Sequence, residues 1–418
     1  MSIGYACLAI GAPNTDLKSC ILKNVSEEKL MFLISYNLNS LENIIDYNIK
    51  NNIKLFRMTS DLIPFGSSPA NTLQWWELFS SELARIGKKI QASGMRVSMH
   101  PGQYTVLNSP NVDVVNRAID DLEYHTKVLD SLGVEKNHKI VLHIGGVYGD
   151  KKLAISRFMI NYSSLDESVK NRLVIENDDR SYNIKDVLEI GIQMNIPVIC
   201  DNLHNEINPY SKEKDIITWI NECKKTWNEK DGYQKIHYSQ QDTSKRAGAH
   251  SSTIDIEEFL DFYERLGRKD IDIMLEVKDK NLSALKCINC TSRDKRINDL
   301  EIEWSKYKYK VLESCPSHYI EIRKLLKDKN EYPAIEMYKL IEDAMKKEII
   351  IGISINAALH VFGYFKKSAS DKERISFLKS IEEYRKGALS NKAIKNKLWK
   401  MTVKYEQSYL FDSYYFTI

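Results

Sequence analysis

The stretches Lys139–Gly146, KIVLHIGG, and Arg172–Asp178, RLVIEND, decide the fold class of this chain. Each is a short apolar run rich in β-branched residues, and each carries a histidine or an acidic residue near its end. Between them, Lys151–Tyr162 has the length and polar character of a helix. A strand, a helix and a second strand in this order predict a parallel β-α-β unit.

Outward from this unit the same alternation covers the first 277 residues. Including the two stretches already quoted, we expect eight strands, at Ile3–Ile10, Leu55–Ser60, Arg96–Pro101, Lys139–Gly146, Arg172–Asp178, Ile196–Asn202, Gln234–Gln241 and Ile271–Val277. The intervening helices are expected at Glu27–Asn51, Thr72–Ala92, Val112–Leu132, Lys151–Tyr162, Ile184–Met194, Glu213–Trp227 and Ile256–Leu266. Eight such units predict an α/β fold of the TIM (β/α)8 barrel type. A doubly wound open sheet is the alternative, but no G-x-G-x-x-G phosphate loop follows the first strand.

The pattern changes after Val277, where charged amphipathic helices replace strands. We predict a barrel domain over residues 1–280, a linker over 281–297 and a smaller all-helical domain over 298–418. Residues 288–418 carry 25 Lys+Arg and 18 Asp+Glu, against 35 and 39 in the rest of the chain. The mildly basic C-terminal part permits contact with nucleic acid, although a solvated helical surface would have the same composition.

Composition excludes several classes of protein. Apolar runs fall short of the roughly 20 residues that a membrane helix needs, and no signal-peptide pattern opens the chain. The seven cysteines are dispersed, which suits reduced thiols, so we expect a cytoplasmic protein without membrane contact. Cys287 and Cys290 form a lone C-x-x-C, and the second pair that a zinc site would need is missing nearby.

Barrel enzymes place their chemistry at the C-terminal ends of the strands. Five of the nine histidines fall at this predicted rim, together with three acidic residues. The eight residues are His100, His143, Glu176, Asp201, His204, His237, His250 and Glu276. A single histidine at a strand end is usually structural, but buried carboxylates must be paired or bind a metal, and mixed histidine and carboxylate sets bind zinc, manganese or iron. At roughly three or four ligands per ion, eight residues suffice for two or three ions, and clustered ions suit phosphodiester hydrolysis.

Five segments carry a family resemblance. They are MHPGQY at 99–104, LHIGG at 142–146, END at 176–178, DNLH at 201–204 and HYSQ at 237–240. In this order they resemble the UV damage endonuclease family, over roughly residues 1–280, with relatives among endonuclease IV and xylose-isomerase-like barrels. The resemblance implies a monomeric DNA repair enzyme that nicks duplex DNA immediately 5′ of UV photoproducts without ATP. It implies a divalent metal cofactor, manganese first, with Zn²⁺, Co²⁺ or Mg²⁺ as alternatives.

The resemblance also implies residue roles. The eight rim residues are the implied metal ligands, and Lys235, His143 and Glu176 are the implied catalytic residues. Lys235 matches a lysine that can carry a carboxylate modification near the metals, and it lies two residues before His237, on the same face of the strand. A lysine that snorkels from the barrel is the structural alternative.

Gln103 and Tyr104 resemble a pair that probes the duplex opposite the lesion, and Tyr5 matches another lesion-contacting position. Damaged bases stack poorly, so flipping them costs less than flipping normal bases. The chain departs from the family at Ser68, where a histidine is often found, so one metal would be differently ligated, with Asp61 as a possible substitute.

The stretch Asn356–Lys366 resembles a helical domain of unassigned function, which we interpret as a DNA-contact or partner module or as an inert stabilising domain. Two other functions remain open for the barrel. One is a metal-dependent sugar isomerase, which would explain the ligands but not the probing pair. The other is a non-catalytic DNA-binding barrel.

Overall fold

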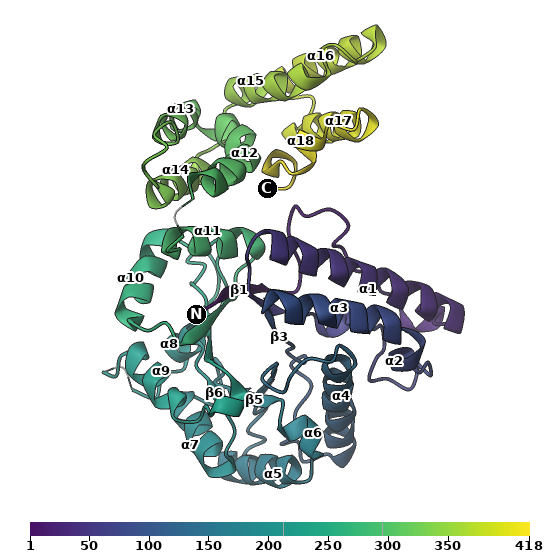
Figure 1. Cartoon of the computed structure of the whole chain (residues 1–418), viewed down its shortest axis with the longest axis vertical. Helices are drawn as coiled ribbons and strands as arrows, with labels where there is room; N and C mark the ends of the chain where they lie inside the picture. The colour runs from purple at the N-terminus through teal and green to yellow at the C-terminus, as the bar shows by residue number, and fades with distance from the viewer. Residues whose placement is uncertain (212, 295) are drawn as a thin grey trace. The chain divides into compact units, whose positions relative to one another are not determined.

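The computed structural model describes residues 1–211, 213–294 and 296–418, and the chain divides into two compact units (Figure 1). The first unit comprises Met1–Ala9, Asn14–Ile254 and Glu258–Leu285. The second comprises Ile10–Pro13, Asp255–Glu257 and Lys286–Ile418. The boundary near residue 285 lies close to the predicted end of the barrel domain at 280.

The first unit is built on eight parallel strands. They are β1 (Ile3–Ala6), β2 (Leu55–Arg57), β3 (Arg96–Ser98), β4 (Ile140–His143), β5 (Leu173–Glu176), β6 (Val198–Ile199), β7 (Gln234–Tyr238) and β8 (Ile271–Leu275). They form two sheets, in the orders β3-β2-β1-β8-β7 and β4-β5-β6. Parallel bridges between Met99 and Ile140 and between Asp201 and His237 join the sheets on both sides. The ring of strands therefore closes in chain order, which confirms the predicted (β/α)8 barrel and excludes an open sheet.

Helices alternate with these strands and surround them (Figure 1). They are α1 (Glu27–Lys50), α2 (Trp75–Leu78), α3 (Ser80–Ser93), α4 (Val112–Ser131), α5 (Lys151–Ser163), α6 (Glu167–Lys170), α7 (Ile184–Met194), α8 (Asn202–Ile207), α9 (Ile216–Lys224), α10 (Ile256–Leu266) and α11 (Asn281–Thr291). Helix α1 begins where the Ser26 side chain accepts a hydrogen bond from the Lys29 amide, and its two first-turn glutamates suit the helix dipole. The helix expected over Thr72–Ala92 is divided at Phe79 into α2 and α3.

Alternation along the strands aims the rim residues into the barrel. Val141, Val174 and Ile199 form one buried apolar cluster on β4, β5 and β6. Each precedes a rim residue by two positions, and side chains two apart on a strand share a face. The apolar layer inside the barrel therefore supports a polar layer directly above it, at the C-terminal ends of the strands.

The second unit is helical among the residues described. Its helices are α12 (Ile297–Ser314), α13 (Pro316–Leu325), α14 (Ala334–Lys346), α15 (Ile351–Phe362), α16 (Asp371–Arg385), α17 (Asn391–Lys404) and α18 (Ser408–Phe411). One large apolar core joins several of them, with the stacked rings of Phe362 and Phe377 4.2 Å apart. The helical character expected of residues 298–418 is thus confirmed.

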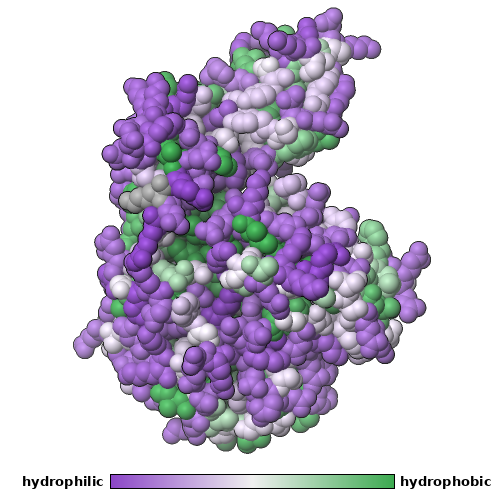
Figure 2. All heavy atoms as spheres, in the orientation of Figure 1, coloured by the Kyte–Doolittle hydropathy of each residue, from purple (hydrophilic) through white to green (hydrophobic). Residues whose placement is uncertain are grey.

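Residues 281–297 differ from the linker that we predicted. Helix α11 occupies Asn281–Thr291, with Leu282 and Ala284 buried, and residue 295 lies outside the described residues. Buried apolar positions within this stretch drive helix formation where its lysines and cysteines suggested a connector. None of the helices described is long and apolar enough to cross a membrane. Hydrophilic side chains cover most of the visible surface, with smaller apolar patches between them (Figure 2).

Candidate active site

Strand register brings the predicted rim residues to one level. His143 on β4 is the register partner of Glu176 on β5, and Asp201 is bridged to His237 of β7. These pairs lie far apart in the chain and become neighbours because the strands are parallel and end at the same edge of the barrel.

Glu176 is the centre of the cluster. Its carboxylate is almost fully buried and lies 3.2 Å from His100 Nε2, 3.9 Å from His143 Nε2 and 2.9 Å from His237 Nδ1. His204 Nδ1 lies 3.5 Å from the same carboxylate. Four of the five rim histidines therefore surround one acidic side chain.

Asp201 and Glu276 complete the set. Asp201 is fully buried, caps α8 by accepting from the His204 amide, and lies 3.8 Å from His204 Nδ1. Glu276, just after β8, lies 3.2 Å from His237 Nδ1 and 3.9 Å from His250 Nδ1. The structure thus places all eight residues named from the sequence in one cluster.

Burial and neighbouring charges shift the pKa values of several side chains in the cluster. Burial lowers the pKa of His100 to about 4, so its imidazole is neutral at pH 7. Burial opposes the charge on Glu176, yet the surrounding histidines, His237 foremost, hold its pKa well below the usual range. Burial would also lower the pKa of His204, but the carboxylates of Asp201 and Glu176 raise it to about 11. Binding of a cation by His204 would therefore release a proton.

Within the part of the chain that the structure describes, several buried polar atoms in the cluster have no hydrogen-bond partner. They are Nδ1 of His143, Oε2 of Glu176, Oδ2 of Asp201, Nε2 of His237 and Nζ of Lys235. Buried donors and acceptors left unpaired are costly, at roughly 1–3 kcal/mol each. A bound cation would satisfy the carboxylate and imidazole atoms, so the residues present fit a divalent metal.

The cluster contains two groups of potential ligand atoms. Within each group, the atoms all lie within 4.8 Å of one another. His100, His143 and Glu176 form one, and Glu176, Asp201 and His237 form the other. Both groups combine nitrogen and oxygen donors, as sites for zinc, manganese or iron do. Glu176 belongs to both, so its carboxylate would help to hold an ion at either group.

Lys235 lies inside the barrel, fully buried on the same strand as His237. Its position confirms that the two side chains share a face of β7, and it rules out a lysine that snorkels to solvent. Burial, reinforced by the nearby Arg96 guanidinium, holds the pKa of the Lys235 amine well below its usual range. The amine therefore gives up its proton more readily than the amine of an exposed lysine does.

A groove of about 1230 Å³ opens beside His100, along the loops that follow β1 to β4. Gln103 and Tyr104 line it, and Tyr104 is 83% exposed, which leaves its ring free to contact a ligand. Ser68 and Asp61 line the same groove but belong to neither group of potential metal ligands. A role for Asp61 in place of the missing histidine has no support from its position.

Tyr5 requires a correction. Its side chain is completely buried, and its hydroxyl donates to Asn48 of α1 at 2.8 Å. The neighbouring Ala6 faces the barrel interior with Leu55, so alternation along β1 points Tyr5 outward against α1. Contact with a DNA lesion, which the resemblance implied, would need exposed surface that Tyr5 does not have.

One residue near the site escaped the sequence reasoning. Arg57, at the end of β2, forms a short ion pair with Glu276. This pairing with Arg57 outweighs the burial of Glu276 and lowers the pKa of its carboxyl. Gly145, just after β4, has a φ of +112°, and a Cβ atom there would lie 2.4 Å from the Asn108 side chain. The glycine is thus needed by the turn itself.

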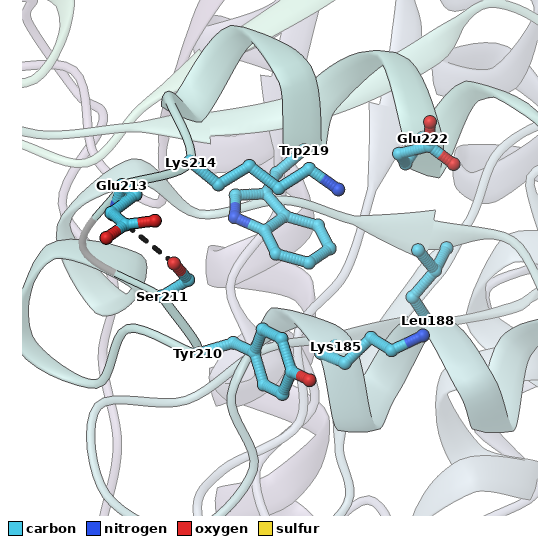
Figure 3. Close-up of a pocket in the computed structure, with 8 residues that line it drawn as sticks. All are labelled: Lys185, Leu188, Tyr210, Ser211, Glu213, Lys214, Trp219 and Glu222. Atoms are coloured by element: carbon cyan, nitrogen blue, oxygen red, sulfur yellow. Dashed lines mark hydrogen bonds between the residues drawn. The ribbon is translucent and has the colours of Figure 1, made fainter.

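A second cavity, of about 410 Å³, lies between α7 and α9 (Figure 3). Trp219 crosses its centre, with Lys214 above the indole ring and Tyr210 at its edge. None of the eight rim residues lines this cavity, so it is separate from the candidate active site.

The fold and the site define a (β/α)8-barrel protein with a candidate divalent-metal centre at the C-terminal ends of its strands. Residues 1–308 match the model of the UV-endonuclease UvdE family. The UV DNA damage endonuclease of Clostridium perfringens (strain 13 / Type A) is 43% identical over 391 residues, 92% of each chain. That of Bacillus cereus (strain G9842) is 32% identical over 289 residues, 68% of this chain and 90% of its own. The chain belongs to the UV-endonuclease UvdE family.

The structural comparison agrees. The crystal structure of SacUVDE superposes with a TM-score of 0.66 at 38% identity, covering 69% of this chain and 97% of that one. Residues 308–418 match a separate family, described as a protein of unknown function (DUF1722). The helical unit therefore has relatives of its own, and they assign it no chemistry.

Proposed function

We propose that this chain is a DNA repair endonuclease that nicks duplex DNA immediately 5′ of UV photoproducts, with divalent metal ions and without ATP. The observation that carries the proposal is the buried carboxylate of Glu176, which four histidines surround beside a groove with an exposed aromatic ring. Family membership and the names of the relatives support the substrate class.

The eight rim residues would hold two or three ions, with manganese first, as the family resemblance implies, and zinc, cobalt or magnesium as alternatives; mixed histidine and carboxylate ligands suit such divalent ions. Such ions, when bound, would supply Lewis acidity at the scissile phosphate and lower the pKa of water. The protein keeps the ligands in place through its own contacts. Asp201 is anchored by the His204 amide, and the Asn177 carbonyl accepts from the His204 ring at 2.9 Å, if Nδ1 carries the proton.

His143, Glu176 and Lys235 are the proposed catalytic residues. The His143 side chain is 27% exposed, the highest value among the residues around Glu176, so it lies nearest to an incoming phosphate. The Lys235 amine is unpaired and disposed to be neutral. A neutral amine can add to carbon dioxide, forming a carbamate and releasing one proton, which would provide a further carboxylate inside the barrel.

Gln103 and Tyr104 are the proposed probing pair. Both line the groove beside His100, and an exposed ring and an amide can fill the space that a flipped lesion vacates. Tyr104 would stack while Gln103 exchanges hydrogen bonds with the opposite bases. Recognition would then depend on the groove and cleavage on the metal cluster.

The test uses the manganese-loaded chain and supercoiled plasmid, either UV-irradiated or intact. We expect nicking of the irradiated plasmid only, and its loss in His143→Ala with the circular dichroism spectrum unchanged. Absence of lesion-dependent nicking would refute the proposal. Aldose–ketose interconversion would instead indicate a sugar isomerase, and binding of damaged DNA without turnover would indicate a non-catalytic barrel.

A further inference from the structure

Helix α17 of the second unit has an unusual distribution of charge. It carries five lysines and no acidic residue over Asn391–Lys404. Its buried side comprises Ile394, Leu398, Met401 and Thr402, which pack toward the core of the unit. Figure 1 shows α17 beside α15 and α16, with which it makes its main contacts.

The opposite side of α17 is exposed. Its exposed residues are Lys392, Asn396, Trp399, Lys400, Val403 and Lys404. At 100° per residue, these positions span an arc of about 140°. We call this surface the α17 basic face.

The charges on this face are largely uncompensated. Among the described residues, Lys392 and Lys400 form no ion pair, whereas Lys404 contacts Glu373 at 2.6 Å. Two exposed acids follow the helix: Glu406, two residues after its end, and Asp412, which follows Phe411, whose ring meets the edge of Trp399. A solvated helix usually intersperses lysines with glutamates, and α17 does not.

We propose that the α17 basic face binds the sugar–phosphate backbone of double-stranded DNA outside the lesion. The inference rests on the proposed function, since its occupant is the substrate of that function. Charge complementarity favours duplex DNA, because residues 1–287 carry more acidic than basic residues and residues 288–418 supply the excess of cations. From Lys392 to Lys404 the helix rises about 18 Å, the span of roughly five phosphates along one strand.

The side chains between the lysines suit the same partner. Trp399 is 37% exposed and Val403 is 51% exposed, so a short apolar strip lies in line with Lys392, with Lys400 and Lys404 along one side of it. Sugar rings alternate with phosphates along a DNA strand, and an apolar strip flanked by ammonium groups complements that alternation. The contact would be independent of sequence and would add affinity without reading the lesion.

The test compares two double variants of the full, manganese-loaded chain. Lys392→Gln/Lys400→Gln removes two charges from the α17 basic face, and neither lysine holds the fold through an ion pair. Lys324→Gln/Lys327→Gln removes the same charge from exposed positions in and after α13. Binding of a fluorescent, undamaged 30-base-pair duplex is measured by anisotropy between 50 and 200 mM salt.

Each phosphate contact contributes about 0.9 to the slope of log affinity against log salt. We expect the slope of the α17 variant to be about 1.8 smaller than that of the wild type. Over the fourfold salt range, the wild type should therefore lose about 12-fold more affinity than the variant. The α13 variant should leave the slope unchanged. Equal changes of the slope in both variants, or no change in the α17 variant, would overturn the proposal. An unchanged slope in the α17 variant is also the result expected if the face binds an acidic protein instead of DNA.

Lesion-dependent nicking under single turnover at saturating DNA separates this inference from the proposed function. The α17 variant should keep the wild-type nicking rate and require more DNA to reach it. If the wild type nicks irradiated plasmid and the slopes do not differ, the further inference alone fails. If the slopes differ as expected but no variant nicks, the proposed function alone fails.

Discussion

Replacing Glu176 by glutamine gives the sharpest test of the metal centre. The substitution keeps the size of the side chain and removes its charge. Glu176 is shared by both groups of potential ligands, so one substitution weakens both. Because partners outside the ligand shell already change metal affinity by about 10- to 100-fold, we expect loss of a shared ligand to reach at least about 100-fold.

The magnitude can be expressed as thermal stability. Manganese at 100 times its Kd should stabilise the wild type by about 2.7 kcal/mol, which raises Tm by about 5–10 °C for a domain of this size. After a 100-fold loss of affinity, the same concentration equals the new Kd. The stabilisation then falls to about 0.4 kcal/mol, or about 1 °C.

The assay is differential scanning fluorimetry of metal-free protein titrated with manganese, with plasmid nicking measured in parallel. Glu123→Gln, at an exposed position on α4, is the matched control and should keep the full shift. A Glu176→Gln protein that is folded and still gains the full 5–10 °C with manganese, estimated as above, would show that Glu176 is not a ligand.

Three further predictions concern other parts of the barrel. The double variant Gln103→Ala/Tyr104→Ala should bind damaged and intact duplex with nearly equal affinity in competition assays, and unchanged discrimination would reduce the pair to rim packing. Lys139 and Asp231 form a buried ion pair at 2.6 Å. Lys139→Met should therefore lower the free energy of unfolding, measured in urea, by about 3–5 kcal/mol, and adding Asp231→Asn should restore part of the loss. A loss below about 1 kcal/mol would contradict this expectation. Hydrogen bonds from two residues of α3, Arg85 foremost and then Lys89, lower the pKa of Glu42 to about 2, below its ordinary 4.5. Its stabilising contribution is therefore complete above about pH 4.5 and lost as the pH falls toward 2, and Glu42→Gln should flatten Tm against pH in that window.

The strands and the rim were predictable because their signals are local. A buried parallel strand is a continuous apolar run, and a polar residue two positions beyond an inward-facing apolar residue must face the same way. Val141 therefore predicts the direction of His143, and Val174 that of Glu176. Strand ends were expected too late by several residues, because the chain turns out of the sheet soon after the observed ends, for example through the left-handed Cys7 after β1 and into α8 at Asn202.

Errors arose where the decisive contact is distant in the chain. Tyr5 was expected to contact the lesion. Side chains alternate along β1, so Tyr5 points toward α1 while the next residue, Ala6, points into the barrel. Arg57 was overlooked because its partner Glu276 lies 219 residues away and no local pattern joins them. The stretch from 281 to 297 looked like a connector because burial of its apolar residues, such as Leu282 and Ala284, is visible only in the folded chain.

The sequence by itself determined the barrel, the family and the eight rim residues, since these follow from apolar periodicity and from short motifs in a constant order. Only the tertiary structure decided that Glu176 is the shared centre, that Lys235 is fully buried without a hydrogen-bond partner among the described residues, and that Tyr5 belongs to the core. Those facts depend on strand register and on the exclusion of water. Both are set when strands from distant parts of the chain close into one ring, and no stretch of the sequence carries that information alone.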